Sequence, residues 1–241
     1  TGPGVLRTAL YGAGGLAAGL ALAVVVALVR EQMDQRLRYS TEIEAMGLRV
    51  LSVIPPDPTA DAESLVVLES LKSPVSEAYR RLRAGVVAAT PHTPLSLLIS
   101  NATPHGIATQ ASVNLAVTLA SAGSKTIMVD TLSSGTDPAG LFGLPPGKGL
   151  WDTLVTGVDP ATLLINIDPH LRLLPRGKAA PTATSRLSGP RMRITVGALR
   201  RRADFLLINA PSMHDADTQA LCSAVDAVLL VVVKGGTTRD H

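Results

Sequence analysis

The chain has 241 residues, of which 46% are hydrophobic, 17% charged and 2% aromatic, and its formal net charge is +3. This aliphatic, weakly charged composition excludes a disordered protein, and the small net charge gives no reason to expect a nucleic-acid partner. The single cysteine, Cys222, excludes a disulfide framework within the chain and a thiolate zinc site.

A long uncharged run opens the chain. Residues 8–29 carry no charged side chain, and a helix of that length crosses the roughly 30 Å hydrocarbon core of a bilayer. The run is too long for a cleaved signal peptide and has no clear cleavage site, so we expect a transmembrane helix within residues 1–30. The flanking arginines are Arg7 before the run and Arg30, Arg36 and Arg38 after it. The positive-inside rule then places residues 31–241 in the cytoplasm.

Glycines are frequent in this run. Residues 12–17 have the spacing of a dinucleotide-binding fingerprint, but no strand is predicted before them to give that motif its structural context. The Gly15-x-x-x-Gly19 spacing fits close packing between membrane helices better, although glycine is also common in such helices without that role. Because the chain opens on Thr1 rather than Met, we expect this span to be the last of a larger membrane unit.

A polar connection leads from the span to the next helix. Residues 31–64 are predicted to form a juxtamembrane helix that ends near Gly47, followed by a proline-rich linker. The next predicted helix carries Glu77, Arg80 and Arg83 at intervals of three residues, so these side chains share one face. That face is either an ordinary solvated surface or a docking stripe for a neighbouring subunit, because arginine forks suit carboxylates across interfaces.

From residue 95 onward, short apolar runs alternate with a helical pattern. The predicted strands are 95–99, 127–129, 205–208 and 227–233. A helix is predicted at 109–122, closed by Gly123. This alternation predicts an α/β domain whose parallel sheet carries helices on both faces. Ligands of such sheets bind beyond the carboxyl ends of the strands. The loops at those ends are 100–109, 130–137 and 209–217.

Several motifs spread over residues 47–238 point to one family. They are LSVIP at 51–55, KSPVSEAYRRLR at 72–83, ATP at 102–104, NLAVTLA at 114–120, LFGLP at 141–145, GLWDTL at 149–154, DAD at 215–217 and VDAVLLVV at 225–232. With these motifs the chain resembles the cytoplasmic domain of bacterial tyrosine kinases, the P-loop family of exopolysaccharide and capsule assembly. In that family the domain follows the second helix of a polysaccharide co-polymerase, or chain-length determinant, membrane unit.

The resemblance carries further expectations. It implies a P-loop NTPase-like domain at residues 65–241, truncated at its C-terminus, behind a helix in a bacterial inner or plasma membrane. It implies that Glu77, Arg80 and Arg83 form the family's Glu-x-x-Arg-x-x-Arg motif, which joins subunits into a homo- or hetero-oligomer. The other implied partners are the membrane and a polysaccharide polymerase or export machinery. The family's usual phosphate acceptor is a C-terminal tyrosine cluster, whereas the last tyrosine here is Tyr79.

The phosphate-binding positions depart from the family pattern. Such a loop needs glycines for close backbone approach, a lysine for the phosphate charge and a hydroxyl group for Mg²⁺. The motif aligns with Pro104, His105, Gly106, Ile107, Ala108, Thr109 and Gln110. Ala108 stands at the lysine position and Ile107 at a glycine position, so Thr109 is the remaining candidate ligand of Mg²⁺ in this loop.

Two acidic positions are changed as well. Asp130 keeps one carboxylate of a pair after the second predicted strand, but Leu132 replaces the other. Asn209 replaces the carboxylate expected after a later strand. Phosphoryl transfer depends on positioning and electrostatic stabilisation, so the joint loss of these charges predicts an inactive domain. Mg-ATP is an expected cofactor only if Thr109 and Asp130 keep a working site.

Three functions stay open on the sequence. The first is a membrane-anchored, non-catalytic scaffold that oligomerises and supports surface-polysaccharide polymerisation and export. The second is an active ATP-dependent tyrosine autokinase of the same pathway, which would use Thr109 and Asp130. The third is a partitioning-type ATPase, which shares the deviant P-loop fold but is disfavoured by the expected membrane helix and by Ala108.

Overall fold

The computed structural model describes residues 19, 22–23, 40–56, 73–90, 92–104, 106–178 and 186–234. The expected membrane span at residues 1–30 lies almost wholly outside these ranges and stays a prediction; Gly19 is described and Gly15 is not. Among the described residues, no helix is both long and apolar enough to cross a bilayer. The short helix α2 (Ser40–Ala45) lies where the juxtamembrane helix is expected to end, and Gly47 follows it at φ +80°.

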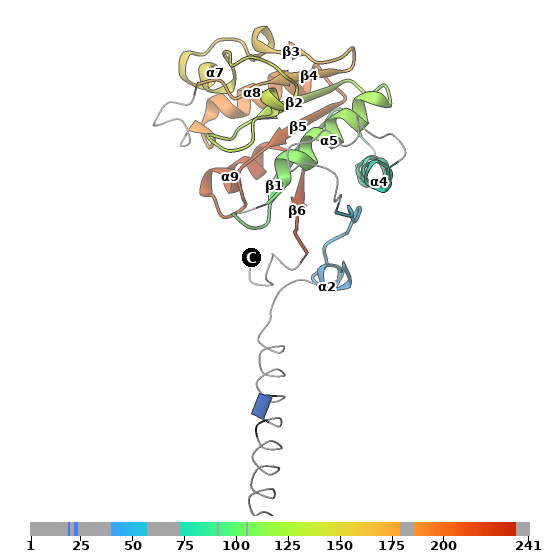
Figure 1. Cartoon of the computed structure of the whole chain (residues 1–241). Helices are drawn as coiled ribbons and strands as arrows, with labels where there is room; N and C mark the ends of the chain where they lie inside the picture. Colours follow the sequence, from blue (N-terminus) through green and yellow to red (C-terminus); the bar gives the residue numbers. More distant parts are fainter. Residues whose placement is uncertain are drawn as a thin grey trace, which may run out of the picture.

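The described part of the chain contains a six-stranded sheet (Figure 1). Its strands are β1 Leu95–Asn101, β2 Thr126–Asp130, β3 Ile165–Asn166, β4 Leu171–Leu174, β5 Phe205–Asn209 and β6 Ala227–Val231. They lie in the order β3-β4-β2-β5-β1-β6, and every pairing except that of β3 with β4 is parallel. The four predicted strands are thereby confirmed, and the α/β fold class with them.

One edge of the sheet departs from the predicted parallel arrangement, because β3 pairs antiparallel with β4. Neither strand is among those predicted. β3 has only two residues, and in β4 Arg172 separates Leu171 from the other two leucines of this four-residue strand. Asp168 closes the turn between them, since its Oδ1 accepts the N–H groups of His170 at 2.6 Å and Leu171 at 2.7 Å. Antiparallel neighbours need only such a short turn.

Helices from different parts of the chain cover the two faces of the sheet. They are α4 Pro74–Ala89, α5 Ala108–Ser121, α6 Pro138–Leu141, α7 Leu150–Thr156, α8 Pro190–Arg200 and α9 Ala216–Leu221, with 3-10 turns η1 Pro160–Leu163 and η3 Cys222–Ala224. Leu97 and Leu207 belong to the core under α4 and α5. Leu98 and Leu206 belong to the core under α7, α8 and α9. Successive residues of a strand therefore pack into the cores on opposite faces of the sheet. Because both faces are covered, the strands are nearly unbroken apolar runs.

Local capping signals fix the helix ends. α4 begins after Ser73, whose Oγ accepts the Ser76 N–H at 3.0 Å, and Pro74 lies in its first turn. α5 agrees with the predicted helix to within one residue at each end. Gly123 follows it in the left-handed conformation at φ +85°, which glycine adopts without strain.

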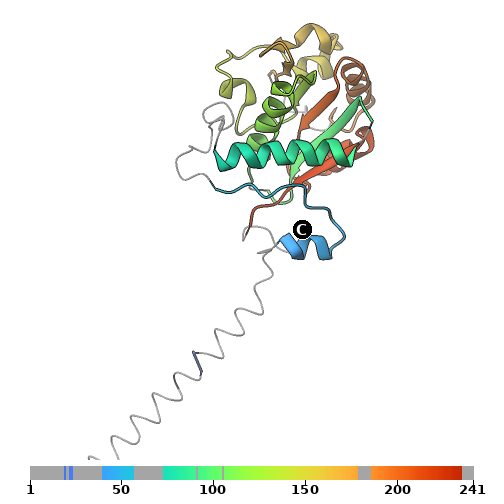
Figure 2. The same ribbon diagram turned by 90° about the vertical axis from the view of Figure 1, so that its right-hand side faces the viewer.

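The segment 48–56 lies beside α4 without regular secondary structure (Figure 2). Ser52 Oγ donates a hydrogen bond to the Ala78 carbonyl at 2.8 Å. Leu51 packs so closely on the helix that a Cβ at Gly85 would lie 3.2 Å from its side chain. The residues that lead into the domain are therefore attached to the helix that carries the predicted docking stripe.

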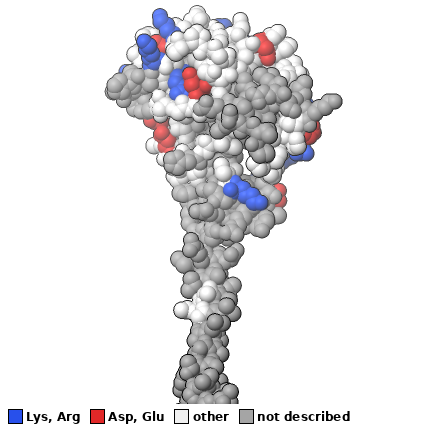
Figure 3. All heavy atoms as spheres, in the orientation of Figure 1, with Lys and Arg blue, Asp and Glu red and all other residues white. Residues whose placement is uncertain are grey.

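Charged side chains are scattered over the face of the molecule drawn in Figure 3. Lys, Arg, Asp and Glu side chains, some of opposite sign side by side, lie there among uncharged ones, as the charged fraction of 17% leads one to expect. Ile194, at 70%, is the most exposed large apolar side chain among the described residues. Single exposed apolar side chains of this kind are ordinary in globular proteins.

Candidate functional site

Loops gather at the carboxyl edge of the sheet (Figure 1). Asp130, the last residue of β2, is in register with Asn209, the last residue of β5, and Asn209 is also paired with β1. The loops at 100–109, 130–137 and 209–217 therefore begin at the same edge of the sheet, as the sequence predicts.

The loop between β1 and α5 holds the degenerate phosphate-binding positions. Asn101 Oδ1 accepts the Ala108 N–H at 2.8 Å, and a side-chain carbon at Gly106 would overlap the same amide group. The Asn101 side chain therefore lies inside the bend of the loop, at the amino end of α5. The motif at 104–110 does not reveal this role, because Asn101 belongs to the preceding strand.

Mg-ATP does not fit this loop as it stands. A P-loop offers free backbone N–H groups, a glycine backbone and a lysine to the phosphates. Here Asn101 already takes the Ala108 N–H, and the buried Ala108 methyl group supplies no charge. Among the remaining loop positions, Pro104 and Ile107 are exposed, Gln110 is half-buried and His105 lies outside the described residues.

A buried polar cluster joins the ends of β2 and β5 to α5. Asn209 Nδ2 donates to Asp130 Oδ1 at 3.1 Å and to Thr109 Oγ1 at 3.2 Å. Ser112 Oγ lies 3.3 Å from Asn209 Oδ1, within hydrogen-bond distance. Asp130 and Asn209 are 0% exposed, so these contacts replace the water that both side chains lose on folding. The structure thus brings together Thr109, Asp130 and Asn209, which the sequence singled out.

Arg176, which follows β4, completes the cluster. Its Nε lies 2.7 Å from Asp130 Oδ2 and forms an ion pair with it. Its terminal nitrogens donate to the Thr136 carbonyl at 2.6 Å and to the Gly135 carbonyl at 3.4 Å. The sequence prediction misses Arg176 because it lacks β4; the position just after an apolar strand is the signal that could have drawn attention to it.

The first turn of α7 holds the backbone around Arg176. The Trp151 N–H donates to the Arg176 carbonyl at 2.9 Å, and the Leu150 N–H donates to the Pro175 carbonyl at 2.8 Å. A side chain at Gly149 would overlap that Pro175 carbonyl oxygen. The two segments can approach this closely only because residue 149 is glycine.

Burial raises the pKa of Asp130 to about 6, above its ordinary value of 3.8. The charge of Arg176 opposes this shift, as do hydrogen bonds from the Leu132 N–H, Arg176 and Asn209. The carboxyl group is therefore mostly ionised at pH 7 and faces a guanidinium group. Leu132, at the position of the missing second carboxylate, contributes only its N–H, 3.2 Å from Asp130 Oδ1.

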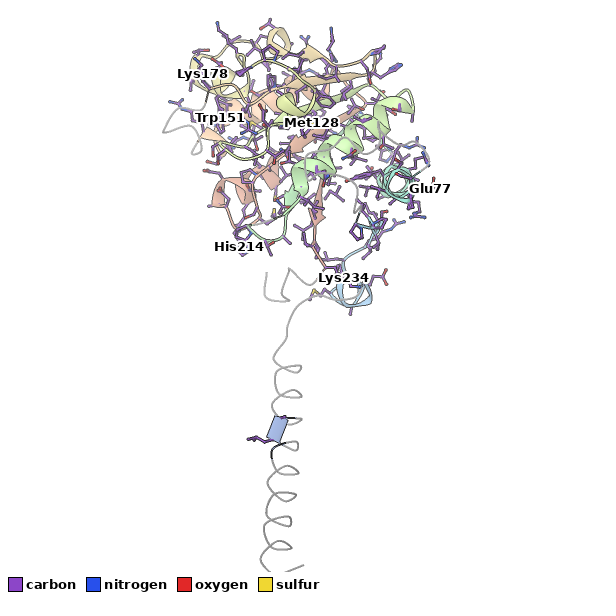
Figure 4. All side chains as sticks on the ribbon, in the orientation of Figure 1. Glu77, Met128, Trp151, Lys178, His214 and Lys234 are labelled. Carbon is purple, nitrogen blue, oxygen red and sulfur yellow. The ribbon has the colours of Figure 1, made fainter. Side chains whose placement is uncertain are left out.

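In the described ranges, His, Cys, Asp and Glu side chains form no group of three or more that could hold a metal ion. The predicted docking stripe lies on α4, and Figure 4 shows its Glu77 on the opposite side of the domain from Lys178. Within the stripe, Glu77 Oε2 and an Arg80 terminal nitrogen are 2.7 Å apart. Nε of Arg83 is buried without a hydrogen-bond partner in the described part of the chain.

Comparison with known proteins places this geometry in a family context. No family model matches the chain. It is 28% identical over 133 residues to the tyrosine-protein kinase CpsD of Streptococcus agalactiae, a match covering 54% of this chain but only 58% of that protein. It is 25% identical over 182 residues to the tyrosine-protein kinase YwqD of Bacillus subtilis (strain 168), a match covering 74% of this chain and 76% of that protein. The chain is homologous to bacterial tyrosine-protein kinases.

The fold of this kinase homologue agrees with a solved kinase domain, that of the Escherichia coli tyrosine kinase ETK. The two superpose with a TM-score of 0.74 at 21% identity, over 82% of this chain and 83% of that domain. The kinase homologue thus has an α/β, P-loop NTPase-like fold with a mostly parallel sheet. The resemblance inferred from the motifs at residues 47–238 is confirmed for the homology and for the fold.

Proposed function

We propose that this kinase homologue is catalytically inactive and acts as a membrane-anchored scaffold, which oligomerises and supports or regulates the polymerisation and export of a surface polysaccharide. The filled loop after β1 carries the proposal: Asn101 takes the Ala108 N–H and lies against Gly106. A bound phosphate group would need that space and that N–H. The pathway comes from the family resemblance, whose members act in exopolysaccharide and capsule assembly.

Missing charges in the candidate site support the same proposal. Ala108 occupies the lysine position, and Leu132 and Asn209 occupy carboxylate positions. Removal of a single preorganised electrostatic group lowers enzyme turnover by roughly 10²–10³-fold, and phosphoryl transfer relies on such groups almost entirely. Asp130, the carboxylate that remains, is already paired with Arg176 at 2.7 Å.

For the active-autokinase alternative, Tyr79 is the tyrosine within the described residues, and it would be a poor phosphate acceptor. Tyr79 is 2% exposed, and burial raises the pKa of its hydroxyl group to about 12. A side chain packed in the core under α4 cannot enter another kinase site while the domain is folded. Homology to tyrosine kinases favours both kinase-related functions over a partitioning-type ATPase.

The scaffold role is proposed to use the α4 stripe of Glu77, Arg80 and Arg83. Glu77 and Arg80 have side chains that are 53% and 41% exposed, so their ion pair contributes little to the stability of the monomer. Such a charged surface is available to a second copy of the chain or to an active relative. The attached segment 48–56 would carry this interface next to the membrane span expected at residues 1–30.

Phosphotransfer from radiolabelled ATP tests the proposal on the full chain in detergent. We expect no phosphotyrosine above the level of an Asp130→Ala variant, while an intact kinase relative is labelled in parallel. ATP hydrolysis or tyrosine labelling that disappears in Asp130→Ala would contradict the inactive scaffold.

A gain-of-binding variant gives the matched positive control. Ile107→Gly combined with Ala108→Lys restores the glycine and the lysine that a phosphate cradle needs. With Asn101→Ala added to free the N–H of residue 108, we expect the variant to gain measurable phosphate affinity without full kinase activity, because Leu132 and Asn209 still replace carboxylates. An equal lack of phosphate affinity in wild type and in this variant would contradict the view that the filled loop excludes phosphate.

A further inference from the structure

We propose, on the basis of the proposed function, that two of the chain's own side chains occupy this site in place of ligands. The Asn101 amide oxygen stands where an anion would bind, and the Arg176 guanidinium stands where a cation would bind. The site is thus self-liganded, and its loops are held closed without nucleotide or metal.

The anion position lies at the amino end of α5. The first N–H groups of a helix lack partners within the helix and attract anions through their partial positive charge. Ile107, the residue that precedes α5, supplies no side-chain acceptor. Asn101 Oδ1 reaches in from β1 and accepts the Ala108 N–H at 2.8 Å. An uncharged amide dipole therefore does here what a phosphate oxygen does in a P-loop.

The cation position lies at Asp130. A carboxylate with no exposed surface needs a counter-ion or hydrogen-bond donors around both oxygens. Arg176 lies 2.7 Å from Oδ2, while Asn209 and the Leu132 N–H lie 3.1 Å and 3.2 Å from Oδ1. Both oxygens are engaged, so a metal ion at Asp130 would compete with Arg176 at Oδ2 or with the two donors at Oδ1.

Arg176 also acts as a latch between two loops. Its terminal nitrogens bind the carbonyl groups of Gly135 and Thr136, in the loop after β2. Its own backbone carbonyl accepts the Trp151 N–H at 2.9 Å. The side chain is only 14% exposed. Its guanidinium is bound by Asp130 through Nε and by the two carbonyl groups through its terminal nitrogens, unlike that of a mobile surface arginine. Loss of its charge should release the loop at 131–137.

Hydrogen exchange of the full chain in detergent tests the latch. Arg176→Gln keeps polar donors but removes the charge, and we expect amides in residues 131–137 to exchange at least about tenfold faster than in wild type. Amides of α8 should not change. Arg193→Gln, which removes an exposed arginine from α8, is the matched control and should leave both regions as in wild type. Unchanged exchange at 131–137 in folded Arg176→Gln, or equal acceleration in the control, would overturn the latch.

A double-mutant cycle tests the counter-ion role. Arg176→Gln alone leaves the Asp130 carboxylate buried without its cation, whereas adding Asp130→Asn removes that charge. We expect the double variant to unfold at a higher temperature than Arg176→Gln alone. Additive losses would contradict the assignment. Arg176→Lys is the alternative variant if Arg176→Gln does not fold. It keeps the positive charge but loses the two hydrogen bonds from the guanidinium to Gly135 and Thr136. We expect it still to accelerate amide exchange at residues 131–137, and a lack of acceleration would overturn the latch.

Asn101→Ala tests the anion position with inorganic phosphate as the probe. We expect faster exchange at residues 106–110 in this variant, slowed again by phosphate, and no phosphate effect in wild type. Asn166→Ala, an exposed position on β3, should behave as wild type. Unchanged exchange in Asn101→Ala, or a lack of phosphate response there, would contradict the assignment. These outcomes differ from tight Mg-ATP binding by wild type, which would sink the proposed function.

Discussion

At Asn209 the difference between an amide and a carboxylate decides how the end of β5 interacts with β2. The amide nitrogen donates to Asp130 at 3.1 Å and to Thr109 at 3.2 Å, whereas an ionised aspartate could only accept. Asn209 thus suits a site whose carboxylate is neutralised from within. A carboxylate at the same place would instead need a metal ion between itself and Asp130.

The variant Asn209→Asp should therefore be strongly destabilised. It buries a second carboxylate against Asp130, and an uncompensated buried charge costs about 3–5 kcal/mol. Chemical denaturation at pH 8 measures the loss, which should shrink at pH 5 because the two carboxylates then share a proton. Asn166→Asp on the exposed edge strand should cost less than about 0.5 kcal/mol. An equally small cost at both positions would refute the buried cluster.

Asp130 predicts a specific pH dependence of stability. Its pKa is about 6 in the folded state and 3.8 as the ordinary value, so the folded state binds the proton more tightly. The stability from this group is fully present below about pH 4 and is lost as the pH rises through about 6, by up to roughly 3 kcal/mol.

The comparison of wild type with Asp130→Asn isolates this effect, because other carboxyl groups titrate in both proteins. From pH 4 to pH 7, we expect wild type to lose stability relative to the variant when unfolding is followed by chemical denaturation. A difference between the two proteins that stays constant over this range would show that Asp130 has an ordinary pKa.

Among the structural elements, the start of α7 and the segment after β4 depend on each other. Gly149 lies against the Pro175 carbonyl group, and the backbone N–H of Gly149 donates to Asp152 Oδ2 at 2.8 Å. Gly177 adopts φ +78°, a conformation that other residues rarely take. The backbones of Gly149 and Gly177 therefore lie close together, next to the residue that carries the ion pair with Asp130.

The variant Gly149→Ala should break this contact. Its methyl group would overlap a backbone carbonyl oxygen, which cannot move as a flexible side chain does, so we expect a loss of about 2–3 kcal/mol in unfolding free energy. Gly147→Ala, two residues earlier, meets nothing within 4 Å and serves as the control. Thermal unfolding separates the two variants, and equal melting temperatures would contradict the close approach.

The central elements of the fold could be predicted because each has a local signal. The strands β1, β2, β5 and β6 are apolar runs, and Gly123 marks the end of α5. Their parallel pairing brought Thr109, Asp130 and Asn209 together as expected. Asn101 and Arg176 could not be found in the same way. Asn101 acts through the curvature of a loop. Arg176 contacts a residue 46 positions away and follows β4, whose apolar residues are interrupted by Arg172.

Over the whole molecule, the α4 stripe and the degenerate site belong to different elements: the stripe lies on α4, whereas the site lies at the ends of β2 and β5 and the start of α5. We expect a substitution of an exposed stripe residue to leave the buried cluster intact, because sites without shared partners affect stability nearly independently. A scaffold of the proposed kind would meet this condition, because its assembly would not call on the chemistry of the site.

The proposed interface predicts the effect of Arg83→Glu on assembly. Reversal of a charge at a subunit contact costs roughly 2–5 kcal/mol, so we expect association of the full chain in detergent to weaken by at least about tenfold. Analytical ultracentrifugation measures the shift, and Arg193→Glu on α8 is the matched control. Identical oligomer distributions for wild type and Arg83→Glu would exclude the stripe as the interface.

The most direct test of the proposal that the site is inactive and internally closed is calorimetric titration of Mg-ATP into the full chain in detergent. We predict no binding stronger than a dissociation constant of about 1 mM, which corresponds to about −4 kcal/mol. Wild type and Asp130→Ala should give the same result. Micromolar binding by wild type that Asp130→Ala abolishes would contradict the account.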